Sequence, residues 1–266
     1  MPIKKHPAIT SLALLAAFSP NPDYRPSLKE IKPKIILQQI TQKQIQEQNK
    51  KGIEYTRQKH KNSTYHIIKI PNNQNTQIHI PSTKEPKYLD ELVTEIKKNK
   101  DENAIAAING SFIRDDKIIG LVKTNGVEIR PNQIIRGSGY FAVKDGKASI
   151  LRTLCNTTNY DEVLQSFPML IYNNELMKVE NGKRSYRSAI AKDTEKNIYL
   201  IVTDTHPFKR NTVTLSEFAK FLETQNYTKA LNLDGGKSTQ MYFNNNYIKN
   251  HRKINNAITI SRRNKK

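Results

Sequence analysis

The stretch Ala230 to Phe243, A-L-N-L-D-G-G-K-S-T-Q-M-Y-F, contains residue types that could carry out chemistry on a ligand. Its candidate ligand contacts are Asp234, Gly235, Gly236, Ser238 and Thr239. An apolar run before the aspartate and another after the hydroxyl residues predict a strand, a tight turn and a second strand, with one carboxylate at the rim. Paired glycines permit positive φ and leave room for a ligand beside the peptide groups. The alternative is a hairpin in which the aspartate only starts the turn.

Three more polar residues stand at the predicted ends of apolar strands. They are Asn109, which Gly110 follows, Arg187 and Asp204. A guanidinium fork suits a phosphate group, and one or two carboxylates suit reactions at a sugar ring. The sequence spacing does not show whether these groups meet. Each therefore keeps a structural alternative, in which Asn109 caps a turn, Arg187 forms a surface ion pair and Asp204 starts a turn.

The sequence has no pattern that predicts a metal centre or a reactive thiol. The six histidines are scattered, and His206 precedes a proline, which favours a loop residue over an acid or base. The single cysteine, Cys155, excludes an intrachain disulfide, and its apolar flank favours a buried, inert thiol. We therefore expect no cofactor. A hard cation held by Asp204 and Asp234 with backbone oxygens stays an alternative, since such sites leave little trace in sequence.

The chain is strongly basic, with 44 Lys and Arg against 24 Asp and Glu and a net charge of +20. Such a charge attracts polyanions, but these lysines are spread along the whole chain, which favours a solvated surface or a compositional bias over a dedicated site. No recognisable motif interleaves basic and aromatic residues, so we do not expect nucleic acid as a partner. The G-K-S at 236–238 lacks the first glycine of a nucleotide-binding P-loop, because Leu231 stands there.

The first 20 residues have the pattern of a secretory signal peptide. Lys4 and Lys5 precede an apolar run from Ile9 to Phe18, and small residues stand near its end. The run is too short to span a bilayer as a stable helix, so we expect cleavage near Ala17 or Ser19 and a secreted or periplasmic protein without membrane contact. An uncleaved anchor is the alternative. Residues 21–52 read as a linker with an amphipathic helix after Pro33.

From residue 53 onward, short apolar segments alternate with turn residues. Strands are predicted at 53–55, 65–70, 77–80, 104–113, 118–123, 139–143, 167–172, 187–192 and 198–203, besides those flanking Asp234. Helices are predicted at 89–98 and 214–222, the second with a Thr214 and Glu217 capping box. This order predicts an α+β fold of mixed or antiparallel sheets with two or three helices, in a single domain over residues 53–262.

Three motifs occur in a fixed order along this domain. They are A-A-I-N-G-S-F-I at 106–113, R-S-A-I-A at 187–191, and T-L-S-E-F-A at 214–219 followed by A-L-N-L-D-G-G-K-S-T at 230–239. Together they resemble the phosphodiester glycosidase family, and most of all its bacterial envelope branch. The resemblance spans about residues 53 to 262. It implies an exported hydrolase that cleaves the sugar–phosphate bond of a glycosyl-1-phosphodiester in an envelope or secreted glycan.

The same resemblance points to individual pocket residues, and we infer their roles from their chemistry. It marks as pocket residues Asn109, Gly110, Arg187, Asp204, Asp234, Gly235, Gly236 and Ser238. Arg187 would hold the phosphate with help from backbone N–H groups of the glycine turn. Asp234 would stabilise the oxocarbenium-like centre, as nucleophile or as base for water, and Asp204 would be the second carboxylate.

Within the motifs the chain departs from the family pattern at four positions, which are Ser111, Ile113, Ala191 and Lys237, and Thr205 follows Asp204 where some relatives often have glycine. We expect these departures to adjoin the pocket and so to bear on the substrate more than on the fold. The alternative function is a binding module of the same fold that holds an anionic glycan or wall polymer without cleaving it.

Overall fold

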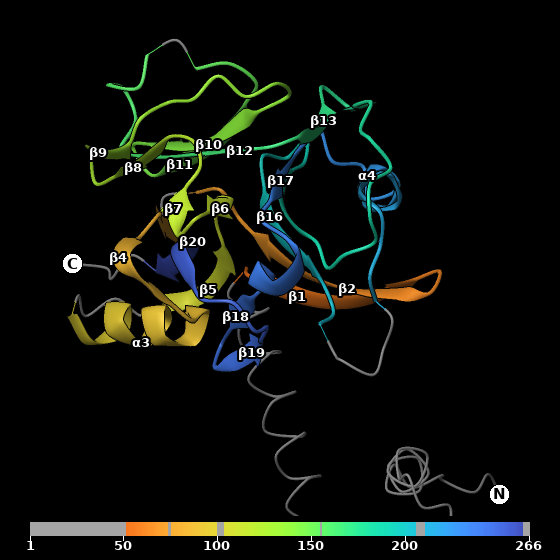
Figure 1. The fold of residues 1–266 in the computed structure, drawn as a ribbon, viewed down its shortest axis with the longest axis horizontal. Helices are drawn as coiled ribbons and strands as arrows, with labels where there is room; N and C mark the ends of the chain where they lie inside the picture. The colour runs from red at the N-terminus through yellow and green to blue at the C-terminus, as the bar shows by residue number, and fades with distance from the viewer. Residues whose placement is uncertain (1–51, 74–75, 100–103, 155, 206–210, 263–266) are drawn as a thin grey trace, which may run out of the picture. The chain divides into compact units, whose positions relative to one another are not determined.

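Sheets dominate the part of the chain that the structure describes. The computed structural model describes residues 52–73, 76–99, 104–154, 156–205 and 211–262, which belong to one compact unit (Figure 1). The predicted α+β class is wrong, because these residues form a predominantly β fold of antiparallel sheets with two α-helices, α3 (Leu89–Asn99) and α4 (Leu215–Glu223). The signal peptide, the helix after Pro33, Cys155 and His206 fall outside the described residues. No helix within these ranges is long and apolar enough to cross a membrane.

The largest sheet has seven strands, and Arg187, Asp204 and Asp234 adjoin the ends of three of them. Its order is β1 (Glu54–His60), β2 (Ser63–Ile70), β16 (Ile198–Thr203), β15 (Ser188–Lys192), β17 (Lys229–Leu233), β13 (Met169–Tyr172) and β14 (Glu175–Leu176). Every neighbouring pair is antiparallel. The central strand β15 therefore starts at the edge where its neighbours β16 and β17 end.

Two further sheets and a ribbon complete the fold. The six-stranded sheet has the order β19 (Asn246–Ile248), β18 (Met241–Phe243), β5 (Ala104–Asn109), β20 (Ile254–Arg262) and β3 (Thr76–His79), with β4 (Ser82–Lys87) also paired to β20. The five-stranded sheet has the order β11 (Lys147–Leu151), β10 (Gly139–Lys144), β12 (Glu162–Ser166), β8 (Val122–Thr124) and β9 (Val127–Arg130). The ribbon pairs β6 (Ile113–Arg114) with β7 (Lys117–Ile118).

Asn and Asp residues with positive φ make the tight hairpins that set this topology. In the two-residue turns at Asn125-Gly126, Asp145-Gly146 and Asn173-Asn174, both central residues have positive φ. A two-residue loop of this kind matches the twist of the strands it joins. The sequence is rich in such turns, so its short apolar runs form antiparallel hairpins.

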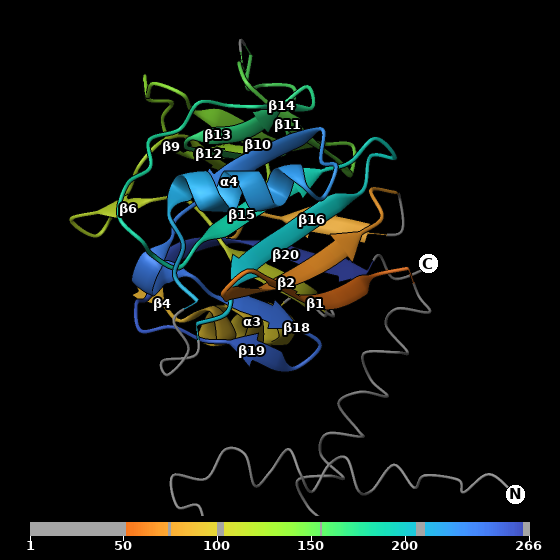
Figure 2. The same cartoon turned by 90° about the vertical axis from the view of Figure 1, so that its right-hand side faces the viewer.

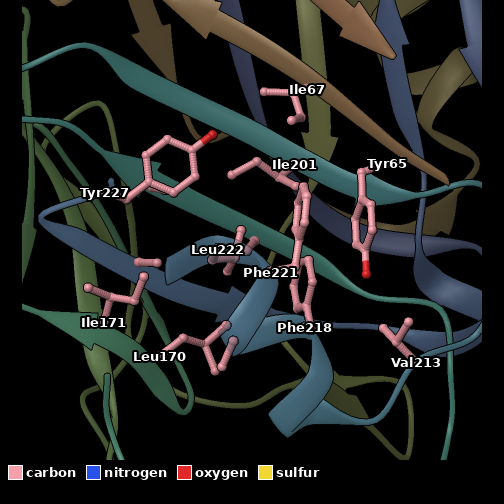
Figure 3. Close-up of a cluster of buried hydrophobic side chains, with 14 residues drawn as sticks. Tyr65, Ile67, Leu170, Ile171, Ile201, Val213, Phe218, Phe221, Leu222 and Tyr227 are labelled. Carbon is pink, nitrogen blue, oxygen red and sulfur yellow. The ribbon is translucent and has the colours of Figure 1, made fainter. Parts of the chain in front are cut away.

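Helix α4 covers one face of the seven-stranded sheet (Figure 2). Its buried residues Phe218, Phe221 and Leu222 pack on alternate residues of the strands, and the Tyr65 ring stacks on Phe221 with ring centroids 3.6 Å apart (Figure 3). The predicted capping box is present, since Thr214 accepts from the Glu217 N–H and Glu217 accepts from the Thr214 N–H. Helix α3 packs in the same way on the six-stranded sheet, through Leu89 and its neighbours one and two turns along.

The stretch Ala230 to Phe243 joins two sheets. Strand β17 pairs with β13 and β15, whereas β18 pairs with β5 and β19. A short 3₁₀ turn, η1 (Gly236–Ser238), connects them. The predicted strands and turn are therefore present, but the hairpin alternative is wrong. Asp234 lies where the chain leaves the seven-stranded sheet for the six-stranded sheet.

Candidate functional site

Three of the predicted residues lie side by side at one edge of the seven-stranded sheet. Asp204 follows the last residue of β16, Arg187 precedes the first of β15, and Asp234 follows the last of β17. Ser188 pairs with Val202 on one side and Leu233 on the other, so the next row brings Arg187 between Thr203 and Asp234. Neighbouring strands lie about 4.8 Å apart, so the backbones at Asp204 and Asp234 are roughly 10 Å apart.

Asn109 brings the end of β5 to this edge from the six-stranded sheet. Its side chain is fully buried, and its Nδ2 donates to the Asp234 carbonyl at 2.7 Å. Its Oδ1 accepts from the Ser188 hydroxyl at 2.8 Å and from the Gln240 N–H at 3.1 Å. These three hydrogen bonds engage both the Nδ2 and the Oδ1 of the buried amide. Asn109 is thus a clamp that fixes the backbone at Asp234, and it does not itself face a ligand.

The Asp234 carboxylate is the buried charge of the site. The residue is 9% exposed, and its Oδ1 accepts from the Gly235 N–H at 2.9 Å. Its Oδ2 is buried and accepts no hydrogen bond of normal geometry from any described residue. Burial raises the pKa of this carboxyl above its usual value, and the nearby Ser238 hydroxyl and Arg252 guanidinium partly oppose the rise. A carboxylate with an unused oxygen and a raised pKa suits proton transfer or attack on a carbon centre.

The Arg187 backbone lies next to that of Asp234 on the neighbouring strand, but the Arg187 guanidinium already donates hydrogen bonds to two backbone carbonyls. Its Nε donates to the Val213 carbonyl at 3.2 Å and its Nη2 to the Lys183 carbonyl at 2.7 Å. Burial lowers its pKa, although an arginine stays cationic at neutral pH. Among the described residues it forms no ion pair, so the positive charge is held in place by neutral carbonyls. One nitrogen, Nη1, remains for an anionic ligand.

Asp204 belongs to a polar group on the first strands of the sheet. Its Oδ2 lies 3.6 Å from the Arg57 Nη2 and 3.9 Å from the His66 Nε2. The Nδ1 of His66 shares a 2.6 Å hydrogen bond with the Tyr55 hydroxyl. Asp204 is therefore part of an ion-pair network at the rim, and the turn that it would start in the alternative interpretation runs into residues 206–210, outside the described residues.

The predicted small residues fit their places for steric reasons. A Cβ at Gly110 would lie 2.1 Å from the Asn256 Oδ1, and a Cβ at Gly235 would lie 2.7 Å from the Tyr186 carbonyl oxygen. Gly236 has φ +59°, which favours glycine. Both glycine N–H groups point inward, to Asp234 and to the Tyr186 carbonyl, so they are not free to bind an anion as expected.

The hydroxyl residues after the glycines are buried behind the turn. Ser238 is 1% exposed and Thr239 is fully buried, and the Thr239 hydroxyl has no partner among the described residues. Ser238 stays close enough to affect the Asp234 carboxyl, whereas Thr239 lies at the start of the path into β18. Neither side chain is therefore exposed for the predicted ligand contact, and Ser238 acts on the site through the Asp234 carboxyl.

Several residues that support the site were not predicted. Besides Arg57, His66, Ser188 and Arg252, they are Gln240, which holds Asn109, and Asn256, whose Oδ1 accepts from the Ser111 N–H at 2.8 Å. The adjacent Asn255 and Asn256 near the start of β20 were the only visible signal. The others resemble ordinary polar positions of strands and loops.

Two cavities flank the edge. One of about 510 Å³ is lined by Arg57, Lys59, Asn62, Thr64 and Asn211, next to Asp204. The other, of about 360 Å³, is lined by Tyr88, Asp90, Glu91, Gln240, Lys249, Asn250 and His251, behind the η1 turn. The described residues contain no cluster of three or more His, Cys, Asp or Glu that could hold a metal ion.

Only some of the departures from the family pattern adjoin the edge. Ser111 binds Asn256 beside Gly110, but Ala191 is buried under α4, four residues along β15. Ile113 packs partly buried in the cluster under α3, and the Lys237 side chain is exposed on the turn. The expectation that all four adjoin the pocket is therefore wrong for Ala191 and Ile113.

Comparisons with known proteins identify relatives of this chain. A family model described as phosphodiester glycosidase matches residues 102–261. The fold is similar to the catalytic domain of zebrafish N-acetylglucosamine-1-phosphodiester alpha-N-acetylglucosaminidase, auto-inhibited by its pro-peptide, with a TM-score of 0.63, 16% identity, and 79% of this chain and 82% of that chain covered. A hypothetical protein from Synechocystis has a TM-score of 0.62 at 14% identity, with coverage of 79% and 62%. No curated protein matches the sequence.

Proposed function

This chain belongs to the phosphodiester glycosidase family, and from that premise we propose that it is an exported hydrolase that cleaves the sugar–phosphate bond of a glycosyl-1-phosphodiester in an envelope or secreted glycan. The observation that carries the proposal is the buried Asp234 carboxylate, which has an unused oxygen and follows the end of β17, next to the cationic Arg187 at the start of the neighbouring strand β15. The family match supports the class of reaction. The identity of the glycan is part of the proposal.

The proposed reaction breaks the bond between C1 of the sugar and the phosphate oxygen. The phosphomonoester leaves with the bonding electron pair, and water supplies the hydroxyl group that C1 gains. A phosphate is a good leaving group, so an anion clamp matters more than a strong general acid. Arg187 would supply this clamp through Nη1, and Asp234 would either attack C1 or remove the proton from water. Asn109 would hold Asp234 in position, because the Asn109 Nδ2 donates to the Asp234 backbone carbonyl.

Export is supported by the charged start, the apolar run and the small residues of the first 20 positions. We expect a mature protein that begins between Phe18 and Asn21. Mass spectrometry of the protein from its native host measures this start directly. A soluble cytoplasmic protein that begins at Met1 or Pro2 would contradict export without touching the proposed chemistry.

Arg187→Lys tests the phosphate clamp. Lysine keeps the charge but has all its donors on one nitrogen, so it cannot reproduce the fork that reaches Val213 and Lys183 from separate nitrogens and leaves a third for phosphate. We therefore expect KM for a chromogenic sugar-1-phosphodiester to rise roughly tenfold and kcat to fall. Arg184→Lys is the matched control, because Arg184 also donates to a loop carbonyl, at Thr212, but stays exposed and pairs with Glu217. Its kinetics should stay close to wild type.

An unphosphorylated glycoside with the same sugar completes the assay. Equal activity of the wild type on this glycoside would refute the role of Arg187 as phosphate clamp. Binding of an anionic glycan by the folded wild type without turnover of any diester would favour the binding-module alternative.

A further inference from the structure

The cavity of about 510 Å³ on the first hairpin is rich in hydrogen-bond donors. Arg57 and Lys59 are two residues apart on β1, so their side chains leave the same face of the strand. Lys59 pairs with Thr64 across the hairpin, and Asn62 and Asn211 complete the lining. The described lining residues therefore offer a guanidinium, an ammonium, a hydroxyl and two amides, and no carboxylate is among them.

The Asn211 side chain has a buried hydrogen-bond donor without an acceptor among the described residues, which indicates that this cavity binds a ligand. Asn211 is 3% exposed, and its Oδ1 accepts from the Thr64 N–H at 3.1 Å. That bond fixes the orientation of the amide, so the other end, Nδ2, is the donor. This Nδ2 is buried without a hydrogen-bond partner in the described part of the chain. A buried donor left unpaired is costly, whereas a bound anion would satisfy it.

The cavity is joined to the proposed reaction edge by the backbone. The Asp204 N–H donates to the carbonyl of Thr64 at 2.9 Å, and Thr64 lines the cavity. The cavity is therefore directly next to Asp204 at the end of β16. Arg57 lies 3.6 Å from Asp204, longer than a direct charged hydrogen bond, and its side chain is 52% exposed. Arg57 can therefore contact a ligand while it stays near Asp204. Asp234 lies two strands further along the same edge.

We propose that this cavity is a subsite for a second phosphate of the substrate, that of the neighbouring repeat in a glycan joined by successive phosphodiesters. The inference rests on the proposed function and specifies its substrate class. A lining with two cations and an unpaired, buried amide donor selects an anionic acceptor group, and the cavity lies at the same end of the seven-stranded sheet as Asp234, two strands away from it. The unused Asn211 Nδ2 then donates to a phosphate oxygen.

Binding of inorganic phosphate tests the subsite without any enzyme assay. In ¹⁵N-labelled protein, the side-chain amide signal of Asn211 should shift and saturate as phosphate is added. Lys59→Glu should weaken this binding by about tenfold or more. Lys147→Glu is the matched control, because Lys147 is also an exposed strand lysine in a hairpin, on β11, and should leave the binding unchanged. No shift at Asn211, or equal weakening by both substitutions, would overturn the subsite.

Kinetics then assign the subsite to the substrate. We expect the ratio of kcat/KM for a substrate with two successive phosphodiesters to that for a substrate with one to fall about tenfold in Lys59→Glu and to stay constant in Lys147→Glu. An unchanged ratio in Lys59→Glu, with both substrates hydrolysed, would overturn the inference and leave the proposed function intact. Saturable phosphate binding at Asn211 without turnover of either substrate would refute the proposed function and leave the anion site standing.

Discussion

Asp234→Asn should lower kcat on a sugar-1-phosphodiester by roughly a hundredfold or more, with little change in substrate affinity. Asparagine keeps the shape and the acceptor for the Gly235 N–H but removes the negative charge. That charge matters most when positive charge develops at the sugar carbon, so its loss affects the transition state more than the ground state. Single-turnover and steady-state kinetics of both proteins measure the two effects separately.

The same substitution should not destabilise the fold. Burial raises the pKa of Asp234 in the folded protein above its unfolded value, so the folded state binds the proton more tightly. The stability from this group is therefore present below the unfolded pKa and lost as pH rises through the folded pKa. At neutral pH the ionised carboxylate is a cost, and Asp234→Asn should have a Tm equal to or above that of the wild type.

The pH profile adds a further check on this role. If Asp234 acts in its ionised form, kcat/KM of the wild type should fall on the acidic side at a higher pH than an ordinary aspartate would give. Asp161→Asn, which removes an exposed carboxylate beside the Asp145 turn, serves as the control and should retain full activity. Full activity of Asp234→Asn would refute the mechanism.

Local features of this fold could be predicted because their causes are local. The hairpin turns follow from Asn-Gly, Asp-Gly and Asn-Asn pairs, and the capping box of α4 follows from Thr214 and Glu217. Two helical stripes and most strands show as apolar periodicity. The fold class was wrong because strands of two to four residues, such as β6, β7, β14 and β19, are too short to show a period.

The partners of each strand could not be predicted, because they depend on contacts between distant residues. Nothing near Asp234 shows that β17 lies beside β15 while β18 pairs with β5 in another sheet. The position of Asp234 at the end of a strand was predicted from the glycine pair. Its unused oxygen and its clamp depend on Asn109, which is 125 residues away in the sequence.

The polar residues around Asp204 were missed for a related reason. Tyr55, Arg57 and His66 alternate along two paired strands, a pattern that ordinary half-exposed hairpins share. Only the structure puts them on one face next to the end of β16. The unpredicted cavity beside them is accordingly the feature that adds most to the sequence-based interpretation.

The strongest structural effect is expected for Asn109→Asp. The substitution replaces the Nδ2 that donates to the Asp234 carbonyl at 2.7 Å by an oxygen, so two acceptors would face each other in a fully buried place. It also buries a negative charge near the Asp234 carboxylate. We expect the free energy of unfolding to fall by about 3 kcal/mol, as for other buried polar groups left unpaired, and activity to fall because Asp234 loses its support.

Chemical denaturation measures the stability change, and Asn246→Asp is its matched control. Asn246 also donates from its Nδ2 to a carbonyl, that of Asn244, but it is exposed on β19 of the same sheet. Water can solvate both the new charge and the freed carbonyl there, so the change should stay within about 0.5 kcal/mol. Wild-type stability of Asn109→Asp would refute the clamp. Lost stability with unaltered kinetics in the remaining folded protein would show that the clamp supports the fold without positioning Asp234.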